Sequence, residues 1–438
     1  MKNLIPFFIN PPVEDFACTN YYSLPFGMLS FIHIIRLHIP EFFYFDFLHE
    51  DFANQGEKYT YKKNNLYEYP RTQIQKPKAL EKLNRYYRRF GNSSDSFDAY
   101  LTKNHINLDT CILYVNTDFT YRGPGIVRFL WELQNQYGIS FSNIVLGGTA
   151  ATLIPEYFKT HLPGIGFFNP DMLMAYTDRV LETMDNSPAF YDVYKNLRFI
   201  PFRLNRFCPD KCAYCASRRI SASLGYTRPV FNKTASWVES LGMHLEQYTK
   251  QFKTDLLIPF DDALMYSLKY LPAIFGRKRY KIYTPNGLHL KMVTPESARL
   301  LFQLGFEQLR FGIETLSQKH QEDSSDKIRN ISIKDKLNML LEAGFNRSQI
   351  RFYIIYGLEG QRFEDVLETI TALKPLGCGF NISGYAPVPG TPMYDRVNKG
   401  LNGIFDREPA LGNNSTVPLW NPEFSEERID KIKRACQY

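Results

Sequence analysis

The sequence predicts an α/β protein built from two successive strand–helix regions: an N-terminal open parallel sheet, then six further strand–helix units. Short apolar runs alternate with helix-like segments before residue 150, and the alternation restarts near residue 200. This is the pattern of parallel sheets whose strands are connected by helices. The 438 residues are 44% hydrophobic, which is enough chain and apolar surface for two or three domains.

In the first region, four apolar runs predict parallel strands, with amphipathic helices between them. The strands are residues 7–10, 42–46, 111–115 and 143–148, and the helices are residues 25–37 and 126–137. Residues 50–100 are polar and rich in Lys, Tyr and Asn, which indicates an inserted loop or helical excursion. Open parallel sheets bind ligands at the carboxyl ends of their strands, where we expect Asn10–Pro11 and Gly147–Gly148.

In the second region, six apolar runs predict strands that are separated by helical segments. The strands are residues 199–204, 255–260, 281–284, 308–312, 349–356 and 379–385, and two of the helices are residues 295–304 and 333–343. Six such units in one sheet form either a doubly wound sheet or a partial barrel. The tail after residue 405 is rich in Asn and Pro and ends in a predicted charged helix.

The composition excludes several classes of protein. The net charge of +7 comes from 52 basic and 45 acidic residues, and without a basic stripe it does not support nucleic-acid binding. Charged and histidine side chains interrupt the most apolar stretch, residues 28–39, so we expect no membrane span. The seven cysteines are odd in number and partly clustered, which favours metal chemistry in a reducing cytoplasm over disulfides.

Three of the cysteines, Cys208, Cys212 and Cys215, lie within eight residues, directly after a predicted strand. Soft thiolates select zinc or an iron–sulfur cluster. A closed zinc site needs a fourth ligand, and the nearest histidine along the chain is the distant His244. Three thiolates on a four-iron cluster leave one iron open. A zinc site with a remote fourth ligand and a group of unrelated buried thiols are the alternatives.

The spacing of these cysteines, with the aromatic Tyr214 just before the last one, resembles the signature of the radical S-adenosylmethionine (radical SAM) superfamily. The resemblance implies that the three cysteines ligate a 4Fe-4S cluster, with Tyr214 beside the cofactor. The open iron of the cluster then chelates S-adenosylmethionine (SAM), which is cleaved reductively to a 5′-deoxyadenosyl radical. A small-molecule or peptide substrate is implied, and a flavodoxin or ferredoxin is the implied low-potential electron donor.

Further motifs of this family follow along the chain in the family's order. Asp261–Asp262 resembles a Phe-x-Asp-Asp motif that holds the methionine ammonium, although Pro259 replaces its Phe; a helix N-cap pair is the alternative. Glu314 matches the acid that contacts the nucleoside. Ile355 and Gly357 match the strand that packs beside the adenine.

The N-terminal region resembles the cobalamin-binding domain that one branch of this family carries. The resemblance lies in Asn10–Pro11, Thr117 and Gly147–Gly148, and it implies that these residues contact cobalamin. The cobalt-ligating Asp-x-His-x-x-Gly motif of that domain is absent, and we expect His49 to be a surface residue.

The resemblance implies a division of the whole chain into two domains and a tail. A Rossmann-like, cobalamin-binding-like open parallel sheet covers residues 1–190, and a partial (β/α)6 TIM-type radical SAM barrel covers residues 196–400. A C-terminal tail covers residues 401–438.

Three functions are compatible with these motifs. The first is cobalamin-dependent methylation of an unactivated carbon. The second is cobalamin-independent epimerisation or cross-linking of a ribosomal peptide, with a vestigial cobalamin domain and with Cys436 as the hydrogen donor to the substrate radical. The third is a non-catalytic iron–sulfur or zinc module, which predicts that SAM is not cleaved.

Overall fold

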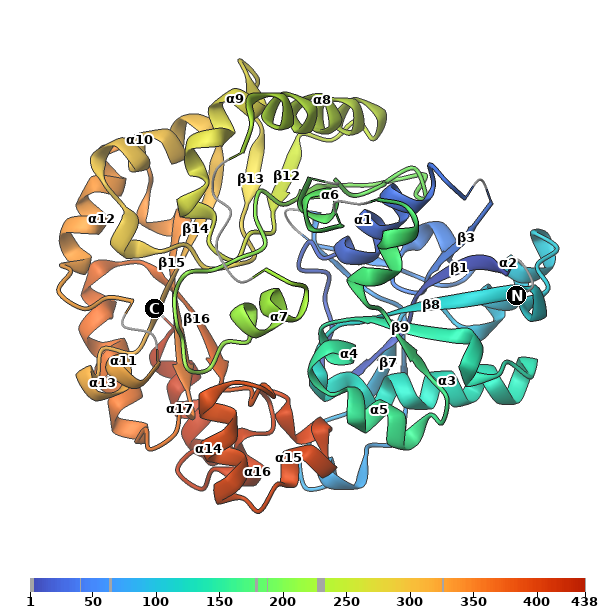
Figure 1. Cartoon of the computed structure of the whole chain (residues 1–438). Helices are drawn as coiled ribbons and strands as arrows, with labels where there is room; N and C mark the ends of the chain where they lie inside the picture. The colour runs from blue at the N-terminus through green and yellow to red at the C-terminus, as the bar shows by residue number, and fades with distance from the viewer. Residues whose placement is uncertain are drawn as a thin grey trace. The chain divides into compact units, whose positions relative to one another are not determined.

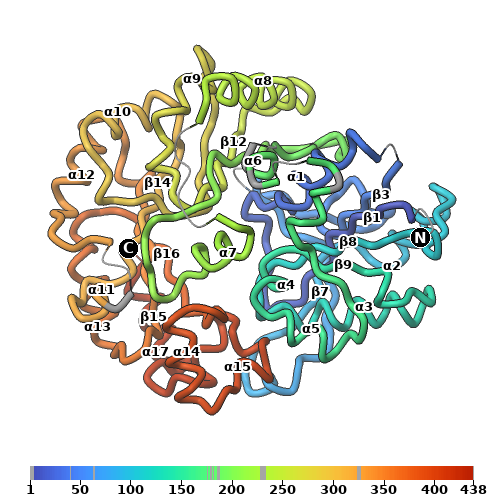
Figure 2. Tube along the Cα trace, viewed as in Figure 1, coloured from blue at the N-terminus to red at the C-terminus, as the bar shows by residue number. Residues whose placement is uncertain are grey.

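The computed structural model describes residues 4–39, 41–62, 65–177, 180–186, 188–226, 233–324 and 327–437. The chain forms two compact units, and Figures 1 and 2 follow it through both by colour. The first unit contains Met1–Leu197, Ser223–Gly225 and Gly403–Gly412. The second contains Arg198–Ala222, Tyr226–Asn402 and Asn413–Tyr438. The C-terminal tail is therefore divided between the two units.

The first unit is built on a five-stranded sheet in the order β10–β9–β8–β1–β3, with every strand pair parallel. Its strands are β1 (Ile5–Asn10), β3 (Phe43–Asp46), β8 (Cys111–Thr117), β9 (Ile144–Gly148) and β10 (Gly166–Phe167). Its main helices are α1 (Phe26–Ile35), α2 (Ser94–Lys103), α3 (Gly123–Tyr137), α4 (Thr149–Leu153), α5 (Pro155–His161) and α6 (Val180–Asn186). The four predicted strands are confirmed, and the two-residue β10 is too short to give a sequence pattern.

Helices cover both faces of this sheet. Phe7 and Ile9 of β1 lie in the core that contains Phe97 of α2. Phe8 points to the opposite face, where its ring centroid lies 5.8 Å from that of Phe31 in α1. Strands that are buried on both faces have continuous apolar runs, which is why β1 shows no polar alternation.

The expectation of an inserted loop or helical excursion at residues 50–100 was incomplete, because the segment also contains four short antiparallel strands, together with 3-10 turns and the start of α2. β2 (Val13–Asp15) pairs with β7 (Arg88–Phe90), which also pairs with β6 (Arg71–Gln73), and β4 (Thr60–Tyr61) pairs with β5 (Tyr67–Glu68). Tyr67 and Tyr69 are buried against Val13 and Phe90. These strands are too short to show periodicity, and tyrosines supply much of the apolar packing in a segment that appears polar by composition.

The second unit contains a six-stranded parallel sheet in the sequential order β11–β12–β13–β14–β15–β16. The strands are β11 (Ile200–Phe202), β12 (Leu256–Pro259), β13 (Lys281–Tyr283), β14 (Phe306–Glu314), β15 (Ile350–Tyr356) and β16 (Gly379–Gly384). A sequential order with helical crossovers is that of a partial barrel, because a doubly wound sheet reverses its strand order. The α/β fold class is therefore confirmed.

The helices of the second unit follow the predicted alternation. They are α7 (Ser217–Ser223), α8 (Ala235–Gln251), α9 (Leu271–Phe275), α10 (Pro295–Leu304), α11 (Gln318–Ser324), α12 (Ile333–Glu342), α13 (Phe363–Leu373), α14 (Pro392–Gly400), α16 (Val417–Trp420) and α17 (Glu426–Ala435). In Figure 1, α8, α10, α12 and α13 lie on the outer side of the strands. The short α15 (Ile404–Arg407) belongs to the first unit. Across the described ranges, no helix has the length and apolar character needed to cross a membrane.

Candidate functional site

The three clustered cysteines lie on the loop that leaves the carboxyl end of β11. Cys208 and Cys212 are half-buried and Cys215 is exposed. The Cys215 backbone N–H donates to the Cys212 carbonyl oxygen at 3.1 Å, so the last two cysteines share one turn. Among the described residues, no three Cys, His, Asp or Glu side chains are assembled at metal-ligand distances. The three sulfurs therefore have to come closer together to share one metal centre.

Burial controls the protonation of these thiols. It raises the pKa of Cys208 to about 12 and that of Cys212 to about 11. The positive charge of Lys327 partly offsets this effect, because it lowers the pKa of Cys212. The thiols thus hold their protons until a metal displaces them, as in other thiolate sites. Three thiols on one short loop are a donor set that fits an iron–sulfur cluster or zinc.

The residues between the cysteines fix this loop to the sheet. Ala213 and Tyr214 pack against an apolar cluster that contains Leu358, Tyr385 and Met393. The Met393 backbone N–H also donates to the Ala213 carbonyl oxygen at 3.0 Å. The cysteine loop is therefore held against segments that follow β15 and β16.

A second anchor of the cysteine loop is Asp210. Lys291 Nζ donates to its two carboxylate oxygens at 2.8 and 3.0 Å, and His289 Nε2 lies 3.3 Å from Oδ2. Burial by itself would raise the pKa of Asp210, but the bonds from His289 and Lys291 hold that pKa well below its usual range. Asp210 thus ties the loop, as a carboxylate, to the segment that follows β13.

Glu314 ends β14 in an unusual backbone conformation. Its φ is +65°, a value that non-glycine residues rarely adopt and that is often found at functional sites. The side chain is buried, and Oε1 accepts hydrogen bonds from Lys327 Nζ (2.8 Å) and from the Tyr214 hydroxyl (3.1 Å). The structure therefore brings the predicted nucleoside-contacting acid together with the aromatic residue of the cysteine motif.

Lys327 completes this group. Burial disfavours its charge, but the nearby Glu314 outweighs that cost and raises the pKa of Lys327 well above its usual value. Its Nζ also lies 5.5 Å from the centroid of the Tyr214 ring. The result is a protonated lysine beside the Cys212 thiol, a position where an anionic group would be stabilised.

The two acids that follow β12 have different partners. The Asp261 carboxylate is buried and accepts hydrogen bonds from the backbone N–H groups of Leu204 (3.2 and 3.0 Å) and Asn205 (2.8 Å). Asp262 Oδ2 accepts a bond from Ser217 Oγ at 2.6 Å. Asp261 therefore holds the segment that leads into the cysteine loop, and its contact with SAM stays a prediction. Asp262 stays the candidate for the methionine ammonium.

Asp261 makes the stability of the second unit depend on pH. Burial raises its pKa to about 7, whereas an unfolded aspartate titrates near about 3.9. Between these values the folded state binds the extra proton, so the stability falls as the pH rises from about 4 to about 7 and then levels off. In urea unfolding of the metal-free protein, we expect Asp261→Asn to reduce this slope. The exposed control Asp255→Asn should keep the pH dependence of the wild type. An undiminished slope in Asp261→Asn would contradict the assignment of this pH dependence to Asp261.

Ile355 and Gly357 lie at the carboxyl end of β15. Ile355 is half-buried against the apolar cluster that also contacts Tyr214. Gly357 has φ +85°, and a Cβ there would lie 2.8 Å from Val417 Cγ1. The fold itself therefore requires this glycine, and the contact of both residues with adenine stays a prediction.

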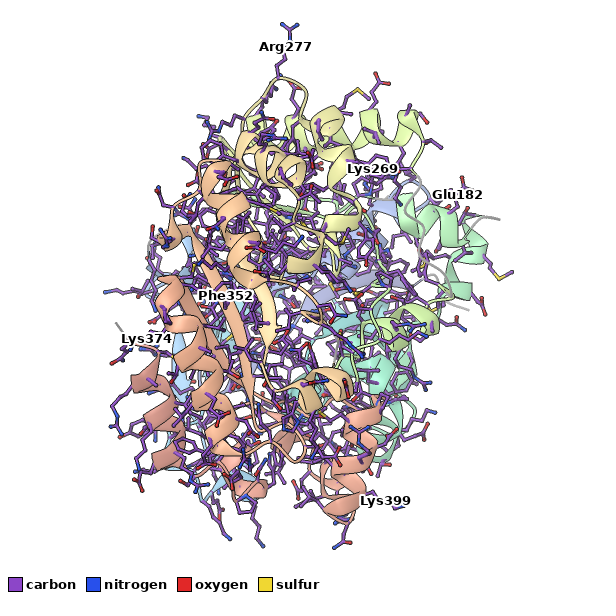
Figure 3. The ribbon with its side chains drawn as sticks, turned by 90° about the vertical axis from the view of Figure 1, so that its left-hand side faces the viewer. Glu182, Lys269, Arg277, Phe352, Lys374 and Lys399 are labelled. Carbon is purple, nitrogen blue, oxygen red and sulfur yellow. The ribbon has the colours of Figure 1, made fainter. Side chains whose placement is uncertain are left out.

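Cys436 does not lie where a hydrogen donor is needed. It caps α17, which packs on α13, and Lys374 at the end of α13 donates to the carbonyls of Ala435 (3.3 Å) and Gln437 (3.1 Å). Lys374 projects outward in Figure 3. Since α13 leads back to the start of β16, this cysteine lies at the amino end of the strands, opposite Cys208 and Glu314. We therefore withdraw it as a catalytic candidate.

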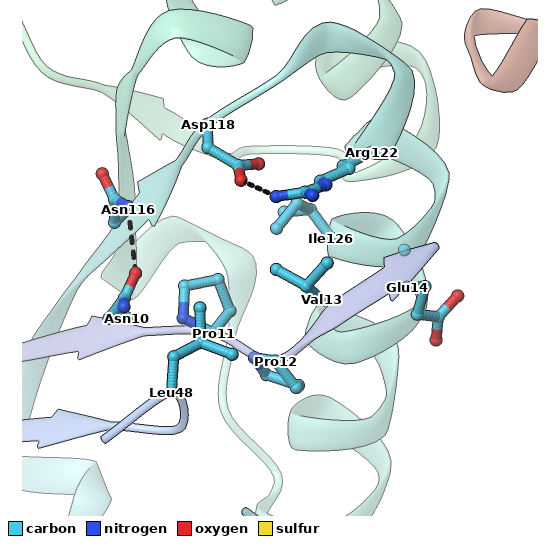
Figure 4. Close-up of a pocket in the computed structure, with 11 residues that line it drawn as sticks. Asn10, Pro11, Pro12, Val13, Glu14, Leu48, Asn116, Asp118, Arg122 and Ile126 are labelled. Atoms are coloured by element: carbon cyan, nitrogen blue, oxygen red, sulfur yellow. Dashed lines mark hydrogen bonds and ion pairs between the residues drawn. The ribbon is translucent and has the colours of Figure 1, made fainter. Parts of the chain in front are cut away.

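In the first unit, the predicted positions lie at the carboxyl ends of β1, β8 and β9, and the fold already uses two of their side chains. Asn10 Nδ2 donates to Asp46 Oδ1 (2.7 Å), and Asn10 Oδ1 accepts from Asn116 Nδ2 (3.0 Å), as Figure 4 shows for the second pair. Thr117 Oγ1 donates to the Gly147 carbonyl (2.9 Å) and accepts from the Ala151 N–H (2.9 Å). Asn10 and Thr117 thus have structural roles whether or not a ligand binds.

A small cavity, lined in part by Pro11, lies at the ends of β1 and β8 (Figure 4). Its volume is about 20 Å³, which is room for about one water molecule. Beside it, Arg122 pairs with Asp118 and, at 3.0 Å, with Asp15. A nucleotide tail does not fit between these two strand ends. Gly148 is exposed and has φ +104°, and a Cβ there would lie 2.0 Å from the Thr117 carbonyl oxygen, so the fold itself requires this glycine, and the contact of Gly147 and Gly148 with cobalamin stays a prediction.

His49 is buried, so the expectation of a surface histidine was wrong. Only 4% of the residue is exposed. Its Nδ1 accepts from the Asp51 backbone N–H (3.2 Å), and its ring centroid lies 4.4 Å from that of Tyr194. Tyr194 is distant along the chain, so local sequence gave no sign of this contact.

The second unit also matches a known family. Residues 202–373 match the model of the radical SAM superfamily. The second unit therefore carries a radical SAM domain, and such a domain indicates an enzyme. Such a domain implies a 4Fe-4S cluster and SAM, together with a reductant and a substrate.

Solved structures extend the likeness to most of the chain. The chain is similar to the radical S-adenosylmethionine methyltransferase TsrM from Kitasatospora setae with cobalamin and a 4Fe-4S cluster bound. The TM-score is 0.56 at 12% identity, over 92% of this chain and 79% of that one. For TsrM with tryptophan substrate and the SAM analogue aza-SAM bound, the TM-score is also 0.56. The identity is 11%, over 92% of this chain and 77% of that one. At these identities the likeness shows the fold alone. No curated protein matches the sequence.

Three residues of this site were not predicted from the sequence: Asp210, His289 and Lys327. Asp210 had a visible signal, because it is the acid inside the Cys-x-x-x-Cys spacing. His289 and Lys327 had none, because the loop after β13 and the segment after α11 bring them to the cysteines from far along the chain.

Proposed function

We propose that this enzyme binds a 4Fe-4S cluster through Cys208, Cys212 and Cys215 and cleaves SAM to a 5′-deoxyadenosyl radical. The observation that carries the proposal is the contact between the cysteine loop and Glu314, made through the Tyr214 hydroxyl at 3.1 Å. This contact supports a cluster site and a nucleoside site that lie next to each other at one end of the sheet. When bound, the cluster supplies the electron that breaks the carbon–sulfur bond of SAM.

The chain's own residues bind and orient SAM in this proposal. Glu314 accepts hydrogen bonds from the ribose diol, and Asp262 accepts one from the methionine ammonium. Lys327 Nζ contacts Glu314 Oε1 at 2.8 Å, which holds the carboxylate in position as a hydrogen-bond acceptor. Ile355 covers the adenine ring, and Gly357 leaves its edge accessible.

The reaction we favour is cobalamin-dependent methylation of an unactivated carbon in a small molecule or a peptide. Its support is the similarity in fold to a cobalamin-bound methyltransferase over 92% of this chain. In this proposal, cobalamin lies over Gly147 and Gly148, with its tail outside the cavity near Pro11. The electron donor is a flavodoxin or ferredoxin, and we propose a cytoplasmic location.

Cobalamin-independent radical modification, such as peptide epimerisation or cross-linking, is the second candidate. The observation that favours it is that Thr117 already bonds to Gly147 and Ala151. A first unit of this kind would bind substrate in place of cobalamin.

Cofactor analysis distinguishes the two reactions. The protein is produced anaerobically in cells supplied with cobalamin, and iron, sulfide and cobalamin are measured per chain. We expect about four irons, as a 4Fe-4S cluster requires, together with one cobalamin. Four irons without cobalamin would support the second candidate, and absence of iron would contradict both.

A further inference from the structure

We propose that His289 is a positioning residue for the cluster: its Nε2–H donates a hydrogen bond to the Cys208 sulfur and raises the reduction potential of the bound cluster. The proposal rests on the proposed function, in which Cys208 is a cluster ligand.

The first argument is the position of the imidazole. His289 is 6% exposed, and its Nε2 lies 4.0 Å from Cys208 Sγ, the outer range for a bond to a sulfur that still carries its proton. The ring of Tyr266 packs against the imidazole at 77°, with the centroids 5.7 Å apart. The histidine is therefore fixed in place beside the ligand loop before any metal binds.

The second argument is which nitrogen carries the hydrogen. Among the described residues, Nδ1 has no hydrogen-bond partner, whereas Nε2 faces two acceptors, the Asp210 carboxylate and the Cys208 sulfur. A neutral imidazole places its hydrogen where acceptors lie. The hydrogen is therefore on Nε2 and points toward the loop.

The third argument is that Asp210 leaves this hydrogen available. Lys291 already satisfies both oxygens of Asp210 at 2.8 and 3.0 Å, while the distance from His289 to that carboxylate is a longer 3.3 Å. When Cys208 ligates iron, it becomes a thiolate and a stronger acceptor. The Nε2–H then turns from Asp210 to the sulfur, and the packed Tyr266 ring keeps the imidazole in place.

Hydrogen bonds to cluster sulfurs are a principal means by which proteins adjust iron–sulfur potentials. A donor at Cys208 stabilises the extra electron of the reduced cluster. His289 thereby makes reduction by the partner protein easier and tightens the position of Cys208.

The test compares His289→Leu, which removes the donor, with His289→Gln, which keeps an N–H donor of similar reach. His244→Leu, on α8, is the control. Each protein is reconstituted anaerobically, iron and sulfide are counted, and the cluster is titrated reductively with electron paramagnetic resonance as the readout.

We expect the ratio of reduced to oxidised cluster in His289→Leu to fall about tenfold at a fixed potential, which for one electron is about 59 mV. His289→Gln should stay within about twofold of wild type, and His244→Leu should match wild type. An unchanged ratio in His289→Leu with full iron content would overturn the role of His289 and leave the proposed function intact. A wild-type protein without a cluster would overturn both.

Discussion

Replacing Cys212 by Ala is expected to abolish cluster assembly and, with it, formation of 5′-deoxyadenosine from SAM. Only two thiols, Cys208 and Cys215, would remain on the loop. The irons of a 4Fe-4S cluster are normally ligated by cysteine thiolates. The measurement is iron and sulfide per chain after anaerobic reconstitution, together with chromatographic detection of 5′-deoxyadenosine in the presence of dithionite.

The matched control is Cys436→Ala, because Cys436 is also half-buried but lies at the amino end of the strands. We expect this variant to keep the iron, sulfide and 5′-deoxyadenosine of the wild type. Cleavage of SAM by Cys212→Ala would refute the assignment of the cluster ligands. Loss of turnover in Cys436→Ala would restore the role that the structure led us to withdraw.

Replacing Glu314 by Gln is expected to weaken SAM binding by about 10- to 100-fold, the range for losing hydrogen bonds to a charged group. The variant keeps the shape of the side chain but removes the charge that Lys327 and Tyr214 now contact. SAM affinity is measured by equilibrium binding to the reconstituted protein, and the rate of 5′-deoxyadenosine formation is measured at saturating SAM.

The second variant, Lys327→Met, tests whether the position of the Glu314 carboxylate is sufficient without the neighbouring positive charge. It leaves the carboxylate in place but removes its cation, and breaking a buried ion pair commonly costs about 3–5 kcal/mol. We therefore expect a lower unfolding temperature as well as weaker SAM binding. The control Glu296→Gln, exposed in the first turn of α10, should bind SAM as the wild type does. Unaltered SAM affinity in Glu314→Gln would rule out its nucleoside role.

Much of the fold could be predicted because parallel strands leave a strong local signal. The run Ile5–Asn10 is buried on both faces, so its continuous apolar character identified it. α10 was bounded correctly because Thr294 caps its start and Gly305 ends it in the left-handed conformation. The strands between residues 50 and 100 were missed because they are only two or three residues long and depend on distant partners.

The site was predictable where one short stretch carries the chemistry. Cys208, Cys212 and Cys215 were predicted as ligands from their spacing and from the family motifs that follow them, because thiolates that share a metal must be close together; their ligand role stays a prediction. Asp261 was expected to contact SAM. The sequence did not indicate that the backbone N–H groups of Leu204 and Asn205 donate hydrogen bonds to its carboxylate. Whether an acid is free for a ligand depends on which backbone donors the fold brings to it.

The sequence by itself determined the alternation of strands and helices and the three thiols after β11, because both are local patterns. Only the tertiary structure decided which residues surround those thiols. His289 lies on the loop after β13, Lys327 follows α11, and Cys436 lies at the opposite end of the strands. Each of these placements depends on how crossover connections stack parallel strands side by side, which joins residues from distant parts of the chain at one end of a sheet.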